Sequence, residues 1–131
     1  MYQKIEIIGR LGRKPEMKYT PQGSAVTSFS VATDNKYTNA AGEQVKETIW
    51  FRVQVWGKMA EVVNQYLDKG SLVFVSGRMV ADKATGAPRI WEKDGKANAS
   101  FEVNASEVKF LSPKSHTEQS AEIPADEDMP F

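Results

Sequence analysis

The segment from residue 46 to residue 57 constrains the fold most, because its side chains alternate strictly between two characters. The apolar members of the alternation are Ile49, Phe51, Val53 and Val55. The residues between and around them are Thr48, Trp50, Arg52, Gln54 and Trp56. A period of two is typical of a β-strand with one face in a core. The other face then carries aromatic, cationic and amide side chains about 7 Å apart along the strand.

This second face suits single-stranded nucleic acid. Flat aromatic rings stack on any base, at roughly 1–3 kcal/mol per base, and cations between them follow the phosphates. Proteins that read duplexes instead need a helix or ribbon that reaches the base edges. An alternative is that Trp50 and Trp56 pack beneath a long polar loop or in a subunit interface.

The remaining pattern predicts four more strands, over residues 4–11, 24–33, 71–79 and 100–111. A short helix is predicted after residue 57 from apolar residues at helical spacing, which are Met59, Val62, Val63, Tyr66 and Leu67. Lys69 and Gly70 predict its basic last turn and its C′ glycine. Five strands with one helix between the third and fourth is the order of an OB-fold, an all-β, partly open barrel that binds oligonucleotides on one face.

Two further aromatics stand beside cations in segments that we expect to be polar loops. Tyr37 follows Lys36, and Trp91 lies between Arg89 and Lys93. Residues 80–99 form a long polar stretch with turn signals at Thr85-Gly86 and Asp94-Gly95.

Basic residues also gather early in the chain. Glu16 is the only acid among Arg10, Arg13, Lys14 and Lys18. Such a cluster is typical of a surface that contacts the phosphates of a nucleic acid. An edge strand whose charges prevent pairing with another chain has the same composition.

Charge divides the chain at residue 112. The 17 basic and 17 acidic residues cancel, but residues 1–111 carry a net +4 and residues 112–131 a net −4. The second part is rich in Ser, Glu, Gln and Pro, which predicts a disordered tail. We therefore expect a domain over 1–111, a flexible linker over 112–125 and an acidic tip over 126–131. The tip consists of Asp126, Glu127, Asp128, Met129, Pro130 and Phe131.

Nothing in the sequence favours an enzyme, a metal site or a cofactor. The chain has no cysteine, and its one histidine, His116, lies in the predicted tail without a partner ligand. Neither GxGxxG nor a phosphate-binding loop occurs. Gly9-Arg10-Leu11-Gly12 matches the GxxG of a KH loop, but it follows a strand and leads to Pro15 instead of joining helices. The absence of a long apolar run or signal-like start predicts a cytoplasmic protein without a membrane partner.

The sequence resembles the bacterial and phage single-stranded DNA-binding proteins over nearly its whole length. The matching motifs are Ile8-Gly9-Arg10-Leu11-Gly12, Trp50-Phe51-Arg52-Val53, Trp56-Gly57-Lys58, Tyr66-Leu67, Ser76-Gly77-Arg78 and the acidic end at Pro130-Phe131. The resemblance implies a homotetrameric OB-fold that wraps single-stranded DNA in replication, recombination and repair. It places base stacking on Tyr37, Trp50, Trp56 and Trp91. It places phosphate contacts on Arg52, Lys58, Lys4, Lys69 and Arg78. The resemblance also implies that the acidic tip docks on replication and repair proteins, and the loop before Trp91 is longer than is usual in the family.

Two other classes stay open from the residues alone. An OB-fold for RNA, or a primosomal adaptor, would use the same strand face without needing the acidic tip. An OB-fold nuclease would need clustered carboxylates on the binding face, and the domain's carboxylates are scattered singly among bases.

Overall fold

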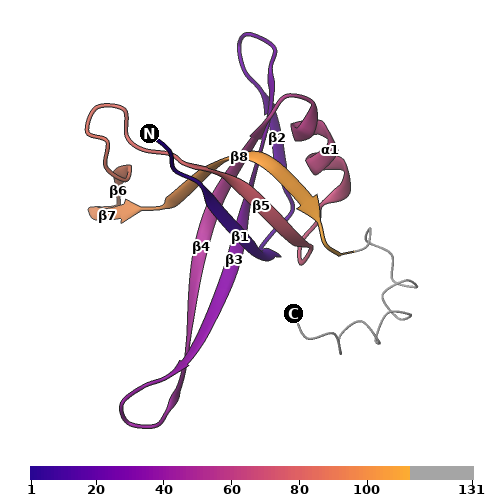
Figure 1. Cartoon of the computed structure of the whole chain (residues 1–131). Helices are drawn as coiled ribbons and strands as arrows, with labels where there is room; N and C mark the ends of the chain where they lie inside the picture. The colour runs from indigo at the N-terminus through magenta and orange to yellow at the C-terminus, as the bar shows by residue number, and fades with distance from the viewer. Residues whose placement is uncertain (113–131) are drawn as a thin grey trace.

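The computed structural model describes residues 1–112, which form a small barrel with one helix (Figure 1). Its strands are β1 (Ile5–Leu11), β2 (Glu16–Tyr19), β3 (Ala25–Thr38), β4 (Gln44–Trp56), β5 (Leu72–Met79), β6 (Ile90–Lys93), β7 (Lys96–Ala99) and β8 (Phe101–Phe110). The helix is α1 (Lys58–Tyr66). The main sheet has the order β1-β5-β8-β4-β3-β2, and an added β1–β3 pairing closes it.

The predicted OB-fold is confirmed. Strands β1, β3, β4, β5 and β8 make the closed barrel, and α1 lies between the third and fourth of these. Every neighbouring pair in the barrel is antiparallel except β4–β8, which is parallel with Val53 opposite Val103.

The core is built from alternate residues of the barrel strands. Val53 and Val55 of β4 are 0% and 1% exposed, as the alternation predicted. They pack with Phe29 and Val31 of β3 and with buried valines of β5 and β8. Burial of this one face of each strand fixes the register, because a slip of one residue would turn the core side chains to solvent.

Helix α1 closes one end of the barrel and ends earlier than predicted. It buries Ala60 and Val63, with Leu67 just beyond its end, whereas Met59, Val62 and Tyr66 of the predicted stripe are more than a third exposed. Its C-cap is Leu67, so Gly70 is not the C′ residue. The Gly70 amide instead donates to the Leu11 carbonyl at 2.9 Å, within the turn that leads to β5.

Strands β3 and β4 run further than predicted and form a hairpin that projects from the barrel (Figure 1). Their pairing extends from Val26 opposite Trp56 to Thr38 opposite Gln44. Tyr37 therefore lies in a strand and not in a loop. Beyond Thr33 nearly every side chain of the hairpin is exposed, so no apolar alternation marks this part in the sequence.

Two strand regions were not predicted as strands. β2 pairs along β3 at the edge of the sheet, so part of the basic segment after Gly12 is an edge strand. β6 and β7 pair with each other across a turn at Asp94 and Gly95, whose φ angles are 54° and 77°. Trp91 therefore lies in a strand of a small hairpin, and Asp94-Gly95 is a turn as predicted.

No helix within residues 1–112 is long and apolar enough to cross a membrane. The predicted linker, apart from its first residue, and the predicted tip from Asp126 to Phe131 lie outside the described residues.

Candidate nucleic-acid interface

The outer face of β3 and β4 has large side chains along β4 and small side chains along β3. We call this face the trough. On β4 it presents Trp50, Arg52 and Gln54. Their cross-strand partners on β3 are Ala32, Ser30 and Ser28. Partners in register point to the same face of a sheet, so the small side chains of β3 leave the sides of the large ones uncovered. Trp50 is 51% exposed.

A glycine makes room for the Trp50 indole. Gly12 follows β1, and its amide donates to the Ser30 carbonyl at 3.1 Å, which holds this turn against β3. A methyl group added to Gly12 would lie 2.5 Å from Cζ3 and 2.7 Å from Cη2 of Trp50. The position of the ring therefore depends on the missing side chain of Gly12.

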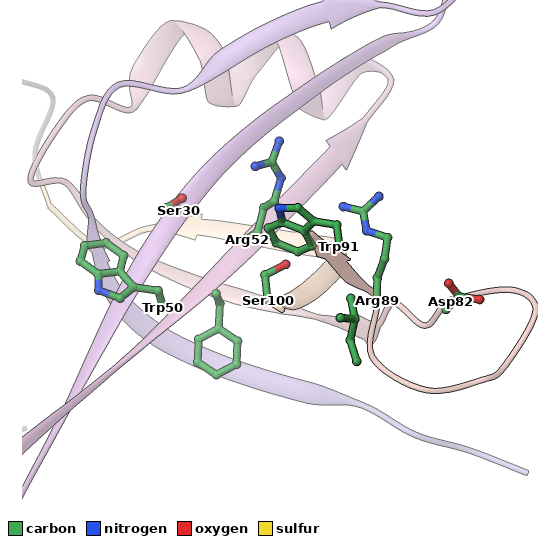
Figure 2. Close-up of a pocket in the computed structure, with 9 residues that line it drawn as sticks. Ser30, Trp50, Arg52, Asp82, Arg89, Trp91 and Ser100 are labelled. Carbon is green, nitrogen blue, oxygen red and sulfur yellow. The ribbon is translucent and has the colours of Figure 1, made fainter. Parts of the chain in front are cut away.

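A hollow with a volume of ≈ 740 Å³ lies over this face. It is lined by Trp50, Arg52, Arg89 and Trp91, whose side chains are drawn in Figure 2. β4 supplies the first two residues, Arg89 immediately precedes β6, and Trp91 lies in β6. Three of the residues predicted from the sequence, Trp50, Arg52 and Trp91, therefore line one hollow.

Two smaller hollows continue the trough towards the basic segment after β1. One lies between Arg13 and Trp50, and the other between Arg13, Lys14 and Arg52. Ser30 lines all three hollows, so they adjoin at its position. The three hollows together are lined by the cations Arg13, Lys14, Arg52 and Arg89, the indole rings of Trp50 and Trp91, and the carboxylates of Glu16 and Asp82.

The Arg89 side chain lies over the Trp91 ring. The Arg89 guanidinium carbon lies 5.9 Å from the centre of the Trp91 ring, within the range of a cation–π contact. Arg89 Nη2 also donates to Glu102 Oε2 at 2.6 Å, and Ser100 Oγ donates to the same oxygen at 2.9 Å.

Trp56 and Tyr37 lie at opposite ends of the β3–β4 ribbon. Trp56 is six residues from Trp50, which corresponds to about 20 Å along a strand. Its Nε1 donates to Asn104 Oδ1 at 3.4 Å, and Lys58 follows it at the start of α1. Tyr37 is 46% exposed near the tip of the projecting hairpin. Both aromatics are accessible, and both lie outside the central hollow.

The remaining predicted cations lie away from the trough. Arg10 is in cross-strand register with Ala32, but its Nη1 donates to the Gly70 carbonyl at 2.9 Å, next to Lys69. Lys4 and Arg78 line a separate hollow of ≈ 380 Å³ near the N-terminus. Lys4 Nζ also lies 3.7 Å from Glu6 Oε2.

Sequence reasoning missed several residues that shape the trough. Ser28, Ser30 and Ala32 form its floor, and their alternation with Phe29 and Val31 was available as a signal. Gly12 and Glu102 gave no such signal, because their roles depend on contacts between distant segments.

The trough offers binding groups and no reactive constellation. Within residues 1–112 no three His, Cys, Asp or Glu side chains gather as a metal site would require. Two carboxylates near the hollow already accept hydrogen bonds. Glu102 accepts from Arg89, and Asp82 accepts from the Ala84 amide. Stacking and charge attraction are what this arrangement provides.

Comparison with known proteins gives a consistent result. Residues 2–111 match the model of the single-strand binding protein family. The single-stranded DNA-binding proteins of Neisseria meningitidis serogroups A and B are each 41% identical over 108 residues, which is 82% of this chain and 59% of theirs. The Helicobacter pylori protein of the same name is 32% identical over 120 residues, 91% of this chain and 63% of its own. This chain therefore spans less than two thirds of the length of these relatives.

Solved structures agree with the fold. A Plasmodium falciparum structure described as a complex with single-stranded DNA is 27% identical, with a TM-score of 0.70 over 86% of this chain and 97% of that one. A deletion mutant of the Thermus aquaticus single-stranded DNA-binding protein is 32% identical, with a TM-score of 0.66 over 83% of this chain and 50% of that one.

Proposed function

The chain belongs to the single-strand binding protein family, and on this premise we propose that it binds single-stranded DNA without sequence preference. It acts as a coat and not as an enzyme. The observation that carries the proposal is the hollow in which Trp50, Trp91 and Arg52 converge. Exposed rings on a rigid barrel stack with unpaired bases, and the cation between them attracts the phosphate backbone.

The proposed path follows the outer face of the β3–β4 ribbon. It runs from Trp56 and Lys58 through the central hollow. Tyr37 is opposite Val45 and so shares the face of Val53 and not that of Trp50; we propose that the DNA reaches it where the strand passes around the projecting hairpin. Arg13 borders the trough in the middle, and Arg10, Lys69, Lys4 and Arg78 are secondary phosphate contacts reached when the strand continues around the barrel. The relative solved with single-stranded DNA supports this use of the fold.

Tryptophan emission tests the proposal directly. Adding oligo-dT should quench the emission strongly, because stacked indoles lose fluorescence against bases. The double variant Trp50→Ala, Trp56→Ala should lose most of the quenching and bind more weakly by about 1–3 kcal/mol for each stacked base lost. Tyr19→Ala, which removes an exposed aromatic outside the trough, is the matched control and should bind normally. Unchanged emission with oligo-dT would overturn the proposal.

We further propose that the chain works as a homo-oligomer, with four subunits as the expected number. β1 pairs with β5 along residues 5–10 but reaches β3 only at residues 10 and 11. Much of one edge of β1 is therefore left without a strand partner in the described part of the chain. Ile8 on this strand is 57% exposed opposite Phe74. Light scattering during gel filtration measures the subunit number, and Ile8→Glu should lower it, because a buried charge opposes association.

The acidic tip is proposed to recruit replication, recombination and repair proteins, which places the protein in the cytoplasm at the nucleoid. A terminal Phe with carboxylates suits an apolar pocket ringed by Arg or Lys. Deleting residues 126–131 should leave DNA binding intact or tighter and abolish capture of these partners. Partner binding by the truncated chain would refute this role.

A further inference from the structure

Glu102 is the only charged residue that is buried within residues 1–112, with 6% of its surface exposed. It lies on β8 opposite Arg52 of β4. Its neighbour Val103 points into the core, so Glu102 faces outward, toward the side that carries the trough. An outward residue of a barrel is buried only when something covers it. Here the cover is the segment between β5 and β8, whose Val80 amide donates to the Glu102 carbonyl at 2.9 Å.

Two hydrogen bonds connect this carboxylate to the small hairpin of β6 and β7. Arg89 precedes β6 and donates to Oε2 at 2.6 Å. Ser100 follows β7 and donates to the same oxygen at 2.9 Å. Both ends of the hairpin are therefore tied to one atom of the barrel. β6 and β7 pair with no other strand in the described part of the chain, so these bonds matter to their placement.

Through Arg89, the hydrogen bonds of Glu102 are connected to the aromatic ring of Trp91. The Arg89 guanidinium, held by Glu102, lies 5.9 Å from the Trp91 ring centre. Figure 2 shows Arg89 and Trp91 next to each other at the hollow. We propose that Glu102 is a positioning residue, which fixes the β6–β7 hairpin and thereby sets Trp91 for base stacking. The proposal rests on the proposed function for its DNA readout.

Charge alone predicts the opposite effect of removing Glu102. A carboxylate near a DNA path repels phosphates, so its neutralisation would strengthen binding if position did not matter. A positioning role predicts weaker binding, because one stacking ring is lost. The sign of the change in affinity therefore separates the two.

The experiment uses the full chain with Trp91 as its only tryptophan, since Trp50→Phe and Trp56→Phe remove the other two. In this background Glu102→Gln keeps the shape of the side chain and removes its charge. We expect lower Trp91 anisotropy without DNA, loss of most of the quenching by oligo-dT, and about tenfold weaker binding, within the range for one stacked base. The salt dependence of binding should stay the same, because no phosphate contact is removed.

Glu107→Gln makes the same change at an exposed position of β8 and should alter none of these readouts. If Glu102→Gln does not fold, Ser100→Ala removes one of the two bonds and should lower the Trp91 anisotropy and quenching in the same direction. Unchanged or tighter binding with unchanged anisotropy would overturn the positioning role. Failure of the unmodified chain to bind oligo-dT would instead overturn the proposed function. The Trp91 anisotropy without DNA would still test whether Glu102 fixes the β6–β7 hairpin.

Discussion

Substituting Gly12 by Ala tests the stacking role of Trp50 without touching an aromatic residue. The added methyl would lie 2.5 Å from Cζ3 of the indole, whereas ordinary contact begins near 3.4 Å. The ring must therefore move by about 0.9 Å, the difference between these two distances. A stacked base contributes roughly 1–3 kcal/mol, so a displaced ring should cost about 1 kcal/mol. This corresponds to a roughly fivefold rise in the dissociation constant for oligo-dT.

A double-mutant cycle shows whether the effect acts through Trp50. Fluorescence titration should give weaker binding for Gly12→Ala in the unmodified chain and no further loss in a Trp50→Ala background. Thermal unfolding of each variant checks that the barrel is intact. Equal losses in both backgrounds, or no loss in either, would refute the idea that Gly12 sets the ring.

Three further outcomes follow from the same structure. Arg52→Gln should make the log-log salt slope of DNA binding shallower by about 0.7, the value for one phosphate contact on a single strand, and titrations at several salt concentrations measure it. Phe29→Ala should lower the free energy of unfolding by about 3–5 kcal/mol in urea, because Phe29 is 4% exposed in the core. In a competition assay, unlabelled oligo-dT should displace labelled oligo-dT from the protein more strongly than RNA of matching sequence does. Stronger displacement by the RNA would indicate an RNA-binding OB-fold instead.

The sequence predicted what depends on burial of one strand face. The alternation around Val53 identified both the core face of β4 and the exposed face with Trp50, because burial repeats every two residues. The helix was predicted for the same reason, but its end was misplaced. Gly70 has the φ of 87° that favours glycine, yet it serves the turn before β5 and not the helix end.

Structure that is stabilised only by strand pairing or by hydrogen bonds between distant residues was not predicted. The β3–β4 hairpin beyond Thr33 is stabilised by its ladder and by a turn in which Asn39 Oδ1 accepts from the Ala41 and Glu43 amides. Neither leaves an apolar period in the sequence. The Glu102–Arg89 bond joins residues 13 apart through a loop, so no local pattern could indicate it.

The parallel pairing of β4 with β8 has a consequence for the order in which the molecule is made. β4 carries Trp50 and Arg52 and pairs with β3 on one side, but the strand on its other side begins only at Phe101. Pairing of β4 with β8 joins segments that are far apart in the chain. Such pairing slows folding, because the entropy of the intervening loop is lost before the stabilising contacts form. During synthesis β4 has to wait for β8, with its apolar side exposed in the meantime. Closure of the barrel at the β4–β8 pairing is therefore late, whereas the β3–β4 hairpin that carries the proposed DNA-binding face joins neighbouring segments and does not depend on it.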